Sequence, residues 1–93
     1  MSSGAMDRQL TIINRLGLHA RPAMQFVDVA NQYQSGVKVC KGDQVVDGKS
    51  IMQMIMLAAT EGTVLKVVAE GPDAEATLEA LDKLVKGKFG EEE

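Results

Sequence analysis

The residues of this chain that could do chemistry cluster in one short run, GLHARPA at residues 17–23. His19 is the only histidine among the 93 residues, and Arg21 follows two positions later. Apolar residues then recur at helical spacing over residues 23–33, and Pro22 suits a first helical turn, where its missing N–H costs nothing. The sequence therefore predicts that an imidazole and a guanidinium lie together at the N-terminus of a helix.

A helix N-terminus of this composition favours phosphate chemistry. The first backbone N–H groups have no intrahelical partner and carry the positive end of the helix dipole, so they attract anions. Arg21 adds a forked donor that matches phosphate oxygens, and a neutral imidazole at His19 is a nucleophile. We therefore interpret His19 as a phosphoryl acceptor. The alternative is an ordinary surface histidine beside a solvated Arg21, although a cation is disfavoured at that end of a helix.

Composition and charge narrow the class of protein. A chain of 93 residues forms one domain, and its net charge of −3 argues against broad binding to nucleic acid or anionic membranes. The single cysteine, Cys40, excludes an internal disulfide, fits a reducing compartment, and with one histidine leaves too few soft ligands for zinc. No apolar run has the length of a membrane span, and residues 1–6 lack the apolar core of a secretory signal. We expect a cytoplasmic protein without a metal, another cofactor or membrane insertion.

The order of the expected elements predicts the fold class. We expect strands over residues 9–14, 37–40, 44–47 and 63–70, and helices over residues 20–34, 51–57 and 73–86. Gly36 is expected to cap the first helix and Gly87 the last. This βαββαβα order predicts an α+β fold, in which a four-stranded antiparallel sheet carries three helices on one face.

The two ends of the chain are expected to lie outside the folded domain. Residues 1–8 are interpreted as disordered or as an artificial extension, and the domain is expected to span residues 9–88. Residues 89–93 are expected to form a mobile acidic tail, because their run of glutamates favours solvation.

A second feature is the almost wholly apolar run IMQMIML at residues 51–57, which follows Ser50. Serine is a favoured N-cap, so we expect a short helix to begin after it. A helix that is apolar on nearly every side is either buried all round or exposed to a partner, and methionine adapts to several partners. We expect one face of this helix to form a partner surface; the alternative is that the methionines fill the core.

These two motifs together resemble a known family. GLHARPA at residues 17–23 is similar to the active-site signature of the HPr family, the histidine phosphocarriers of the bacterial phosphoenolpyruvate-dependent phosphotransferase system. GKSIM at residues 48–52 is similar to a second HPr segment, and the resemblance extends from about residue 9 to residue 86. It implies the HPr fold, an open-faced β-sandwich of four antiparallel strands and three helices.

The resemblance also implies a function and the residues that perform it. His19 would accept a phosphoryl group on Nδ1, the pros nitrogen, from phospho-enzyme I and pass it to an EIIA-type domain, as a carrier without turnover of its own. Arg21 and the backbone N–H groups of Ala20 and Arg21 would hold the phosphate. Ser50 matches the serine that an ATP-dependent HPr kinase/phosphorylase modifies in many Gram-positive and some Gram-negative bacteria; the alternative is that Ser50 is only an N-cap.

The expected docking surface combines the histidine loop with the methionine-rich helix. Its members are Leu18, Ala20, Met24, Lys49, Ile51, Met52 and Ile55. Because a carrier docks to several partners in turn, we expect a monomer. Residues 14–16 and the C-terminal tail are similar to nitrogen-related members of the family, whereas residues 48–52 are similar to sugar-regulatory members, so both branches stay open.

Three other functions are weighed against the carrier. A regulatory module would act through phosphorylation of Ser50 and protein contacts, without transfer from His19. An enzyme with His19 as general base would need a carboxylate partner, which the neighbouring sequence lacks although the fold could bring one. An RNA-binding sheet would need aromatic side chains for stacking, yet Phe26, Tyr33 and Phe89 lie outside the predicted strands, so we expect no nucleic-acid partner.

Overall fold

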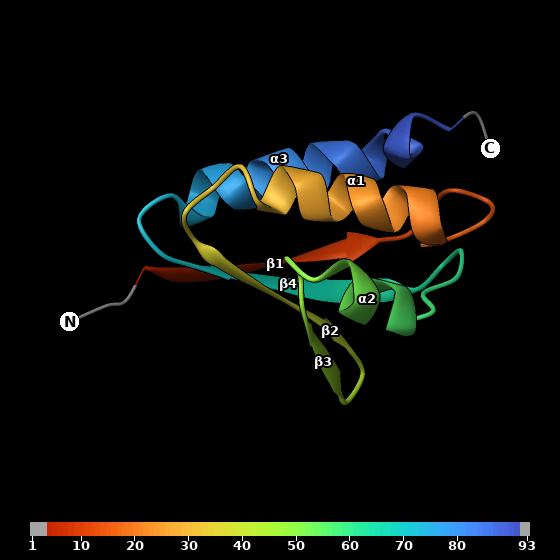
Figure 1. Cartoon of the computed structure of the whole chain (residues 1–93), viewed down its shortest axis with the longest axis horizontal. Coiled ribbons are helices and arrows are strands. Elements are labelled where there is room, and N and C mark those ends of the chain that lie inside the picture. The colour runs from red at the N-terminus through yellow and green to blue at the C-terminus, as the bar shows by residue number, and fades with distance from the viewer. Residues whose placement is uncertain (1–3, 92–93) are drawn as a thin grey trace.

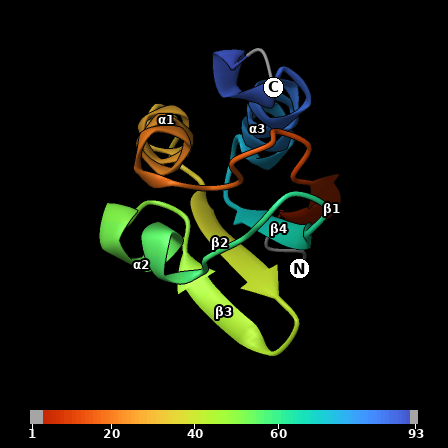
Figure 2. The same ribbon diagram turned by 90° about the vertical axis from the view of Figure 1, so that its right-hand side faces the viewer.

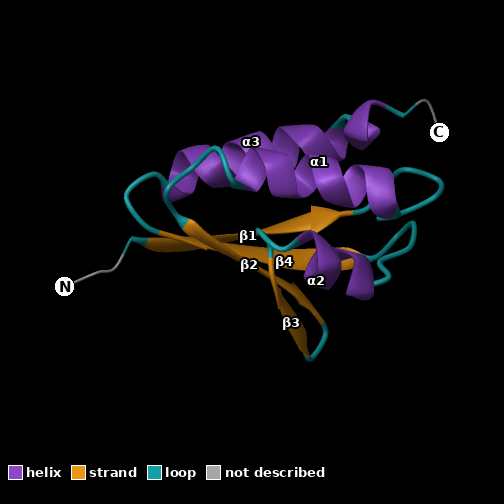
Figure 3. Cartoon of the chain, viewed as in Figure 1, coloured by secondary structure: helices purple, strands orange, loops and turns teal. Residues whose placement is uncertain are grey.

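Two layers, a sheet and a set of helices, make up the fold. The computed structural model describes residues 4–91, and within this range a four-stranded sheet and three α-helices are present (Figure 1). The elements are β1 (Ala5–Thr11), α1 (Ala20–Ala30), β2 (Gly36–Lys41), β3 (Gln44–Asp47), α2 (Ile51–Met56), β4 (Val64–Glu70), α3 (Ala74–Lys86) and a 3₁₀ turn, η1 (Lys88–Gly90). Figure 3 shows helices and strands following one another as βαββαβα. The predicted fold class and element order are confirmed.

The sheet has the strand order β1-β4-β2-β3, and every neighbouring pair is antiparallel. β4 pairs with β1 on one side, from Glu70 opposite Ala5 to Val64 opposite Thr11, and with β2 on the other. Seen from the end of the molecule, α1, α2 and α3 all lie on one side of the sheet (Figure 2). The arrangement is therefore an open-faced sandwich.

Alternate strand residues build the core beneath the helices, as a sheet with one buried face requires. The buried side chains of the sheet include Leu10, Val37, Val39, Leu65, Val67 and Ala69, and those of the helices include Phe26, Val27, Met54, Leu78, Leu81 and Val85. In β4, the exposed Val64 and Lys66 alternate with the buried Leu65 and Val67. Burial of apolar surface, at about 25 cal/mol per Å², is the main term that stabilises such a core.

β1 begins earlier than the sequence pattern predicts. The expected strand covers residues 9–14, whereas the observed strand starts at Ala5 and pairs with β4 along its whole length. Its first half is largely exposed and shows no apolar alternation; backbone pairing and an ion pair from Arg8 to α3 hold it instead. The expectation of disorder is therefore wrong for residues 5–8, and residues 1–3 lie outside the described part of the chain.

α1 ends at Ala30 rather than at residue 34, because Asn31 caps the helix. The backbone N–H of Asn31 and its side-chain amide both donate to the Val27 carbonyl, at 2.9 and 3.0 Å. Gly36, the expected cap, instead begins β2, so that expectation is wrong. The last helix does end at its expected cap, Gly87.

A carboxylate joins the segment before β2 to the start of α3. Asp73 accepts hydrogen bonds from the Ser35 hydroxyl at 2.6 Å and from the backbone N–H groups of Gln34 and Ser35 at 2.9 Å. The Ser35 hydroxyl, followed by the Gln34 N–H, lowers the pKa of Asp73 from 3.8 to about 2. The ionised carboxylate is therefore favoured in the folded state, and its ionisation stabilises that state.

We predict that Asp73 makes the stability of the protein depend on pH in the acid range. Its folded pKa of about 2 lies below the unfolded value, so its contribution is complete above about pH 5 and is lost as the pH falls towards 2. Free energies of unfolding from urea titrations should fall more steeply over this window for wild type than for Asp73→Asn. Asp43→Asn, in the exposed turn between β2 and β3, is the control. Equal slopes in all three proteins would contradict the prediction.

Candidate functional site

His19 is the residue at which α1 begins, as the sequence predicts. Its backbone is extended, with φ −78° and ψ −172°, its carbonyl accepts the Ala23 N–H at 3.0 Å, and its side chain makes no cap hydrogen bond. Pro22 has no N–H, and the backbone N–H groups of Ala20 and Arg21 belong to the first turn, which offers them no intrahelical acceptor. The N-terminus of α1 is therefore suited to an anion, beside an imidazole.

The loop before His19 is fixed against the segment that precedes β4. Gly17 has φ +71°, in the left-handed region that favours glycine, and a Cβ there would lie 2.5 Å from the Ala59 carbonyl oxygen. The Leu18 N–H donates to that same oxygen at 2.8 Å, and the Asn14 amide donates to the Gly17 carbonyl at 2.7 Å. These contacts set the position of His19 in the absence of a partner.

A carboxylate from the C-terminal segment completes the site. One oxygen of Glu91 lies 2.8 Å from Nε2 of His19, and the other accepts a hydrogen bond from the Asn14 amide at 3.0 Å. The hydrogen bond from Asn14, then that from His19, lowers the pKa of Glu91, and the charges of His19 and Arg21 act in the same direction. The His19 and Glu91 side chains are 39% and 20% exposed, so the pair is reachable from solvent.

A turn after α3 brings Glu91 to the histidine. Lys88 and Phe89 have φ of +56° and +55°, and the Phe89 side chain is buried in the core. Figure 1 shows η1 and the start of α1 towards the same end of the molecule. The expectation of a mobile tail does not hold for residues 89–91, because Phe89 is packed and Glu91 is hydrogen-bonded; residues 92–93 lie outside the described part of the chain.

Asn14 and Glu91 are the two site residues that sequence reasoning missed. In the sequence, nothing distinguishes Asn14 from an ordinary loop residue. Glu91 lies 72 positions after His19, in a run of glutamates that gives no sign of a contact with it. One usable signal is present: Phe89 is the single large apolar residue of the run KGKFGEEE, and an isolated phenylalanine near a chain end indicates packing.

Most residues of the expected docking surface are exposed. Met24 of α1 is 50% exposed, and Met52 and Ile55 of α2 are 71% and 43% exposed. Ala20 is also exposed. Leu18 is the exception, because its side chain is buried in the core, so its assignment to a partner surface is wrong.

The structure of α2 confirms the predicted N-cap. Each of the two interpretations of the methionines holds for part of the helix. The Ser50 hydroxyl accepts the Gln53 N–H at 3.3 Å, which makes Ser50 the N-cap of the helix. Met54 is fully buried and fills the core, whereas Met52 and Met56 are largely exposed. One face of the helix is therefore core and the other is free.

The remaining expected residues differ in how freely they can reach a partner. Ile51 is partly buried and packs against the core. Lys49 is half-buried, and its ammonium donates to the Tyr33 carbonyl at 2.9 Å. Arg21 is exposed, and its positive charge contributes to the lowered pKa of Glu91.

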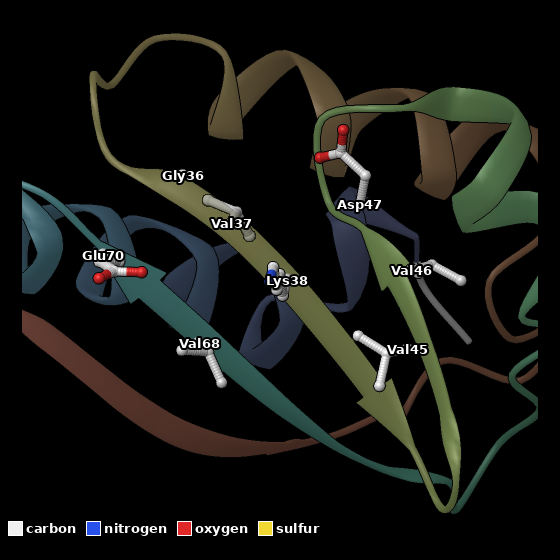
Figure 4. Close-up of a pocket in the computed structure, with 8 residues that line it drawn as sticks. All are labelled: Gly36, Val37, Lys38, Val45, Val46, Asp47, Val68 and Glu70. Carbon is white, nitrogen blue, oxygen red and sulfur yellow. The ribbon is translucent and has the colours of Figure 1, made fainter.

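A hollow of about 480 Å³ lies elsewhere on the sheet (Figure 4). It is lined by residues of β2, β3 and the end of β4, among them Lys38, Val45, Val68 and Glu70. It shares no residue with the site around His19, so it does not contribute to a phosphate site there.

Known proteins resemble this chain over nearly its whole length. The sequence profile of the PTS-HPr family, described as the PTS HPr component phosphorylation site, matches residues 6–87. The chain belongs to the HPr family. The phosphocarrier protein HPr of Pseudomonas aeruginosa is 48% identical over 86 residues, which cover 91% of this chain and 96% of that relative.

Solved HPr structures share the fold. The crystal structure of HPr-C-His from Thermoanaerobacter tengcongensis has a TM-score of 0.91 and 42% identity, and the match covers 95% of this chain and 99% of that one. An HPr dimer from the same organism has a TM-score of 0.75 and 44% identity, over 88% of this chain and 94% of that one. As a member of the HPr family, the chain is a phosphoryl-group carrier of the phosphotransferase system rather than an enzyme. Within residues 4–91, no helix is long and apolar enough to cross a bilayer.

We predict that Gly17→Ala destabilises the protein and displaces the loop before His19. The new Cβ would lie 2.5 Å from the Ala59 oxygen and 2.9 Å from the Thr60 Cα, both backbone atoms, in a left-handed conformation. Strained conformations of this kind cost about 1–3 kcal/mol, and the clash adds to that cost, so we expect the free energy of unfolding in urea to fall by at least ~2 kcal/mol.

Gly42→Ala is the matched control for that measurement. Gly42 also has a positive φ, +58°, but a Cβ there meets no atom within 4 Å. Its loss of stability should be the smaller of the two. Equal losses at both glycines would show that the close approach of Gly17 to Ala59 contributes nothing.

Proposed function

We propose that His19 is the residue on which this HPr protein carries its phosphoryl group, with Nδ1 as the nucleophile. The observation that supports the proposal best is the position of the imidazole at the N-terminus of α1, with Nε2 held by Glu91. An ionised carboxylate only accepts hydrogen bonds, so Nε2 carries the ring proton and the lone pair lies on Nδ1. Nδ1 is then the atom that attacks phosphorus.

The transfer step needs no proton to move. The Nδ1 lone pair forms the P–N bond while the bond from phosphorus to the donor breaks, and its electron pair returns to the donor. Charge on the phosphoryl oxygens is then met by the N–H groups of Ala20 and Arg21 and by the Arg21 guanidinium. The donor is phospho-enzyme I, and the reverse step on an EIIA-type domain discharges the carrier.

Both partners would dock on the exposed surface around His19. Its proposed members are the exposed Ala20, Met24, Met52 and Ile55, together with the partly buried Lys49 and Ile51. Flexible methionine side chains suit a surface that must fit two different proteins in turn. Because both partners need the same imidazole, we propose a monomer acting in the cytoplasm, although one relative was crystallised as a dimer.

The assignment predicts one acid-labile phosphate on each chain. Incubation with phosphoenolpyruvate and enzyme I should label the wild type, and acid should release the label, as it does from a P–N bond. His19→Ala should abolish labelling, because the chain has no other histidine. The variant should keep the wild-type melting temperature, which excludes unfolding as the cause. Undiminished acid-labile labelling of His19→Ala would refute the assignment.

A second candidate function is regulation through Ser50. Its hydroxyl lies at the start of α2, next to the exposed Met52, and Ile55 follows one turn later. A phosphate on Ser50 would place about two negative charges beside the apolar docking surface and so weaken partner binding. The modifying enzyme would be an HPr kinase/phosphorylase. The alternative is that Ser50 serves only as the N-cap.

Ser50→Asn separates these two roles. Asparagine is as good an N-cap as serine, so the variant should keep α2 and the wild-type stability while losing the phosphorylatable hydroxyl. With ATP and HPr kinase/phosphorylase, wild type and His19→Ala should acquire an acid-stable phosphate that Ser50→Asn lacks. If wild type remains unlabelled, the N-cap is the only role left to Ser50.

A further inference from the structure

Both carboxylate oxygens of Glu91 have a hydrogen-bond partner. One oxygen meets Nε2 of His19 at 2.8 Å and the other meets the Asn14 amide at 3.0 Å. We propose that Glu91 is a positioning residue for phosphoryl transfer, which fixes the His19 ring with Nδ1 free and balances the charge that the ring acquires. This inference rests on the proposed role of His19 as the phosphoryl acceptor.

The contact is supported from both sides. Phe89 is buried with 3% exposure, so the segment that carries Glu91 is tied to the core two residues earlier. Asn14 is fully buried, and its amide donates both to Glu91 and to the Gly17 carbonyl at 2.7 Å. Glu91 is thus held between an immobile donor and the imidazole.

The orientation of the Asn14 amide favours its contacts with Glu91 and Gly17 over a hydrogen bond to its own Oδ1. Its Oδ1 is buried and has no hydrogen-bond partner among the described residues. Turning the amide over would place Oδ1 against the Glu91 carboxylate and the Gly17 carbonyl, both acceptors, so the observed orientation is the one that holds Glu91. A buried polar atom left unpaired requires an explanation, and the need to orient a functional carboxylate provides one.

The chemistry of the transfer step explains how the Glu91 carboxylate would assist it. When Nδ1 of a neutral imidazole forms a bond to phosphorus, the ring retains the Nε2 proton and gains one positive charge. The Glu91 carboxylate accepts a hydrogen bond from that Nε2–H, and its negative charge stabilises the charged ring. The lowered pKa of Glu91 keeps the carboxylate ionised near neutral pH. The same arrangement of carboxylate and imidazole orients histidines in hydrolase triads and metal sites.

Glu91→Gln tests the charge while keeping a hydrogen-bond acceptor. Removing the carboxylate behind a metal-bound histidine costs roughly 10–100-fold in metal affinity or activity. By analogy, transfer from phospho-enzyme I, measured by rapid quench, should slow by about tenfold in Glu91→Gln. Glu79→Gln is the matched control, since Glu79 lies exposed on α3 and makes the same change in net charge. It should transfer at the wild-type rate.

Nitrogen NMR of the imidazole provides a readout that a merely structural role would not move. His19 is the only histidine, so its two ring nitrogens are observed without overlap. In the neutral ring of the wild type, Nε2 should carry the proton and Nδ1 the lone pair. In Glu91→Ala the two tautomers should mix, and the two nitrogen shifts should approach each other while the melting temperature stays near that of wild type.

The outcomes separate this inference from the proposed function. A wild-type transfer rate in Glu91→Gln, an equal slowing in Glu79→Gln, or a proton on Nδ1 in the wild type would each overturn the role of Glu91. If His19→Ala still loses its label in that case, the acceptor assignment stands. Failure of the wild type itself to acquire an acid-labile phosphate would overturn both.

Discussion

The backbone pairing of β4 with β1 determines where the histidine lies. The pairing continues past the ends of the strands, since the Ile12 N–H donates to Thr63 at 2.9 Å and the Gly62 N–H donates to Ile12 at 2.7 Å. Three residues before Gly62, the Ala59 carbonyl accepts the Leu18 N–H. The register of two strands is thus transmitted to the residue that precedes His19. A slip by one residue would turn the apolar face of β4 to solvent, so burial of the core fixes the site as well as the fold.

Local signals were enough to predict the parts of the site that local backbone conformation controls. Pro22 after His19 marks the first turn of α1, and Ser50 before an apolar run marks the start of α2; both positions are observed. The expected ranges of the three later strands and of the last helix are likewise within one residue of the observed bounds. In each of these cases the residues that decide the structure are close together in the sequence.

Most of the features that the sequence did not reveal depend on distant partners. The first half of β1 is a strand because β4 offers it hydrogen bonds, and its own residues carry no apolar pattern. Asn31 ends α1 by bonding Val27, whereas Gly36 had the stronger local signal for a cap. Glu91 reaches His19 because Phe89 is buried, which a run of acidic residues conceals. In β1 and at Glu91, tertiary contacts overrode the local propensity, whereas the end of α1 is set by a contact four residues away.

A phosphoryl carrier has two requirements that conflict, since its reactive atom must be reachable by two proteins and yet be oriented before either arrives. In this fold they are met by different atoms of one ring. His19 is 39% exposed, so partners have access, while the contact at Nε2 restricts the ring from the side that transfer does not use. Preorganisation lowers the cost of reaching the reactive geometry in each encounter. Glu91 and Asn14, which hold Nε2, lie outside α1 and α2. A partner that covers the exposed residues of α1 and α2 can therefore leave the contact at Nε2 intact.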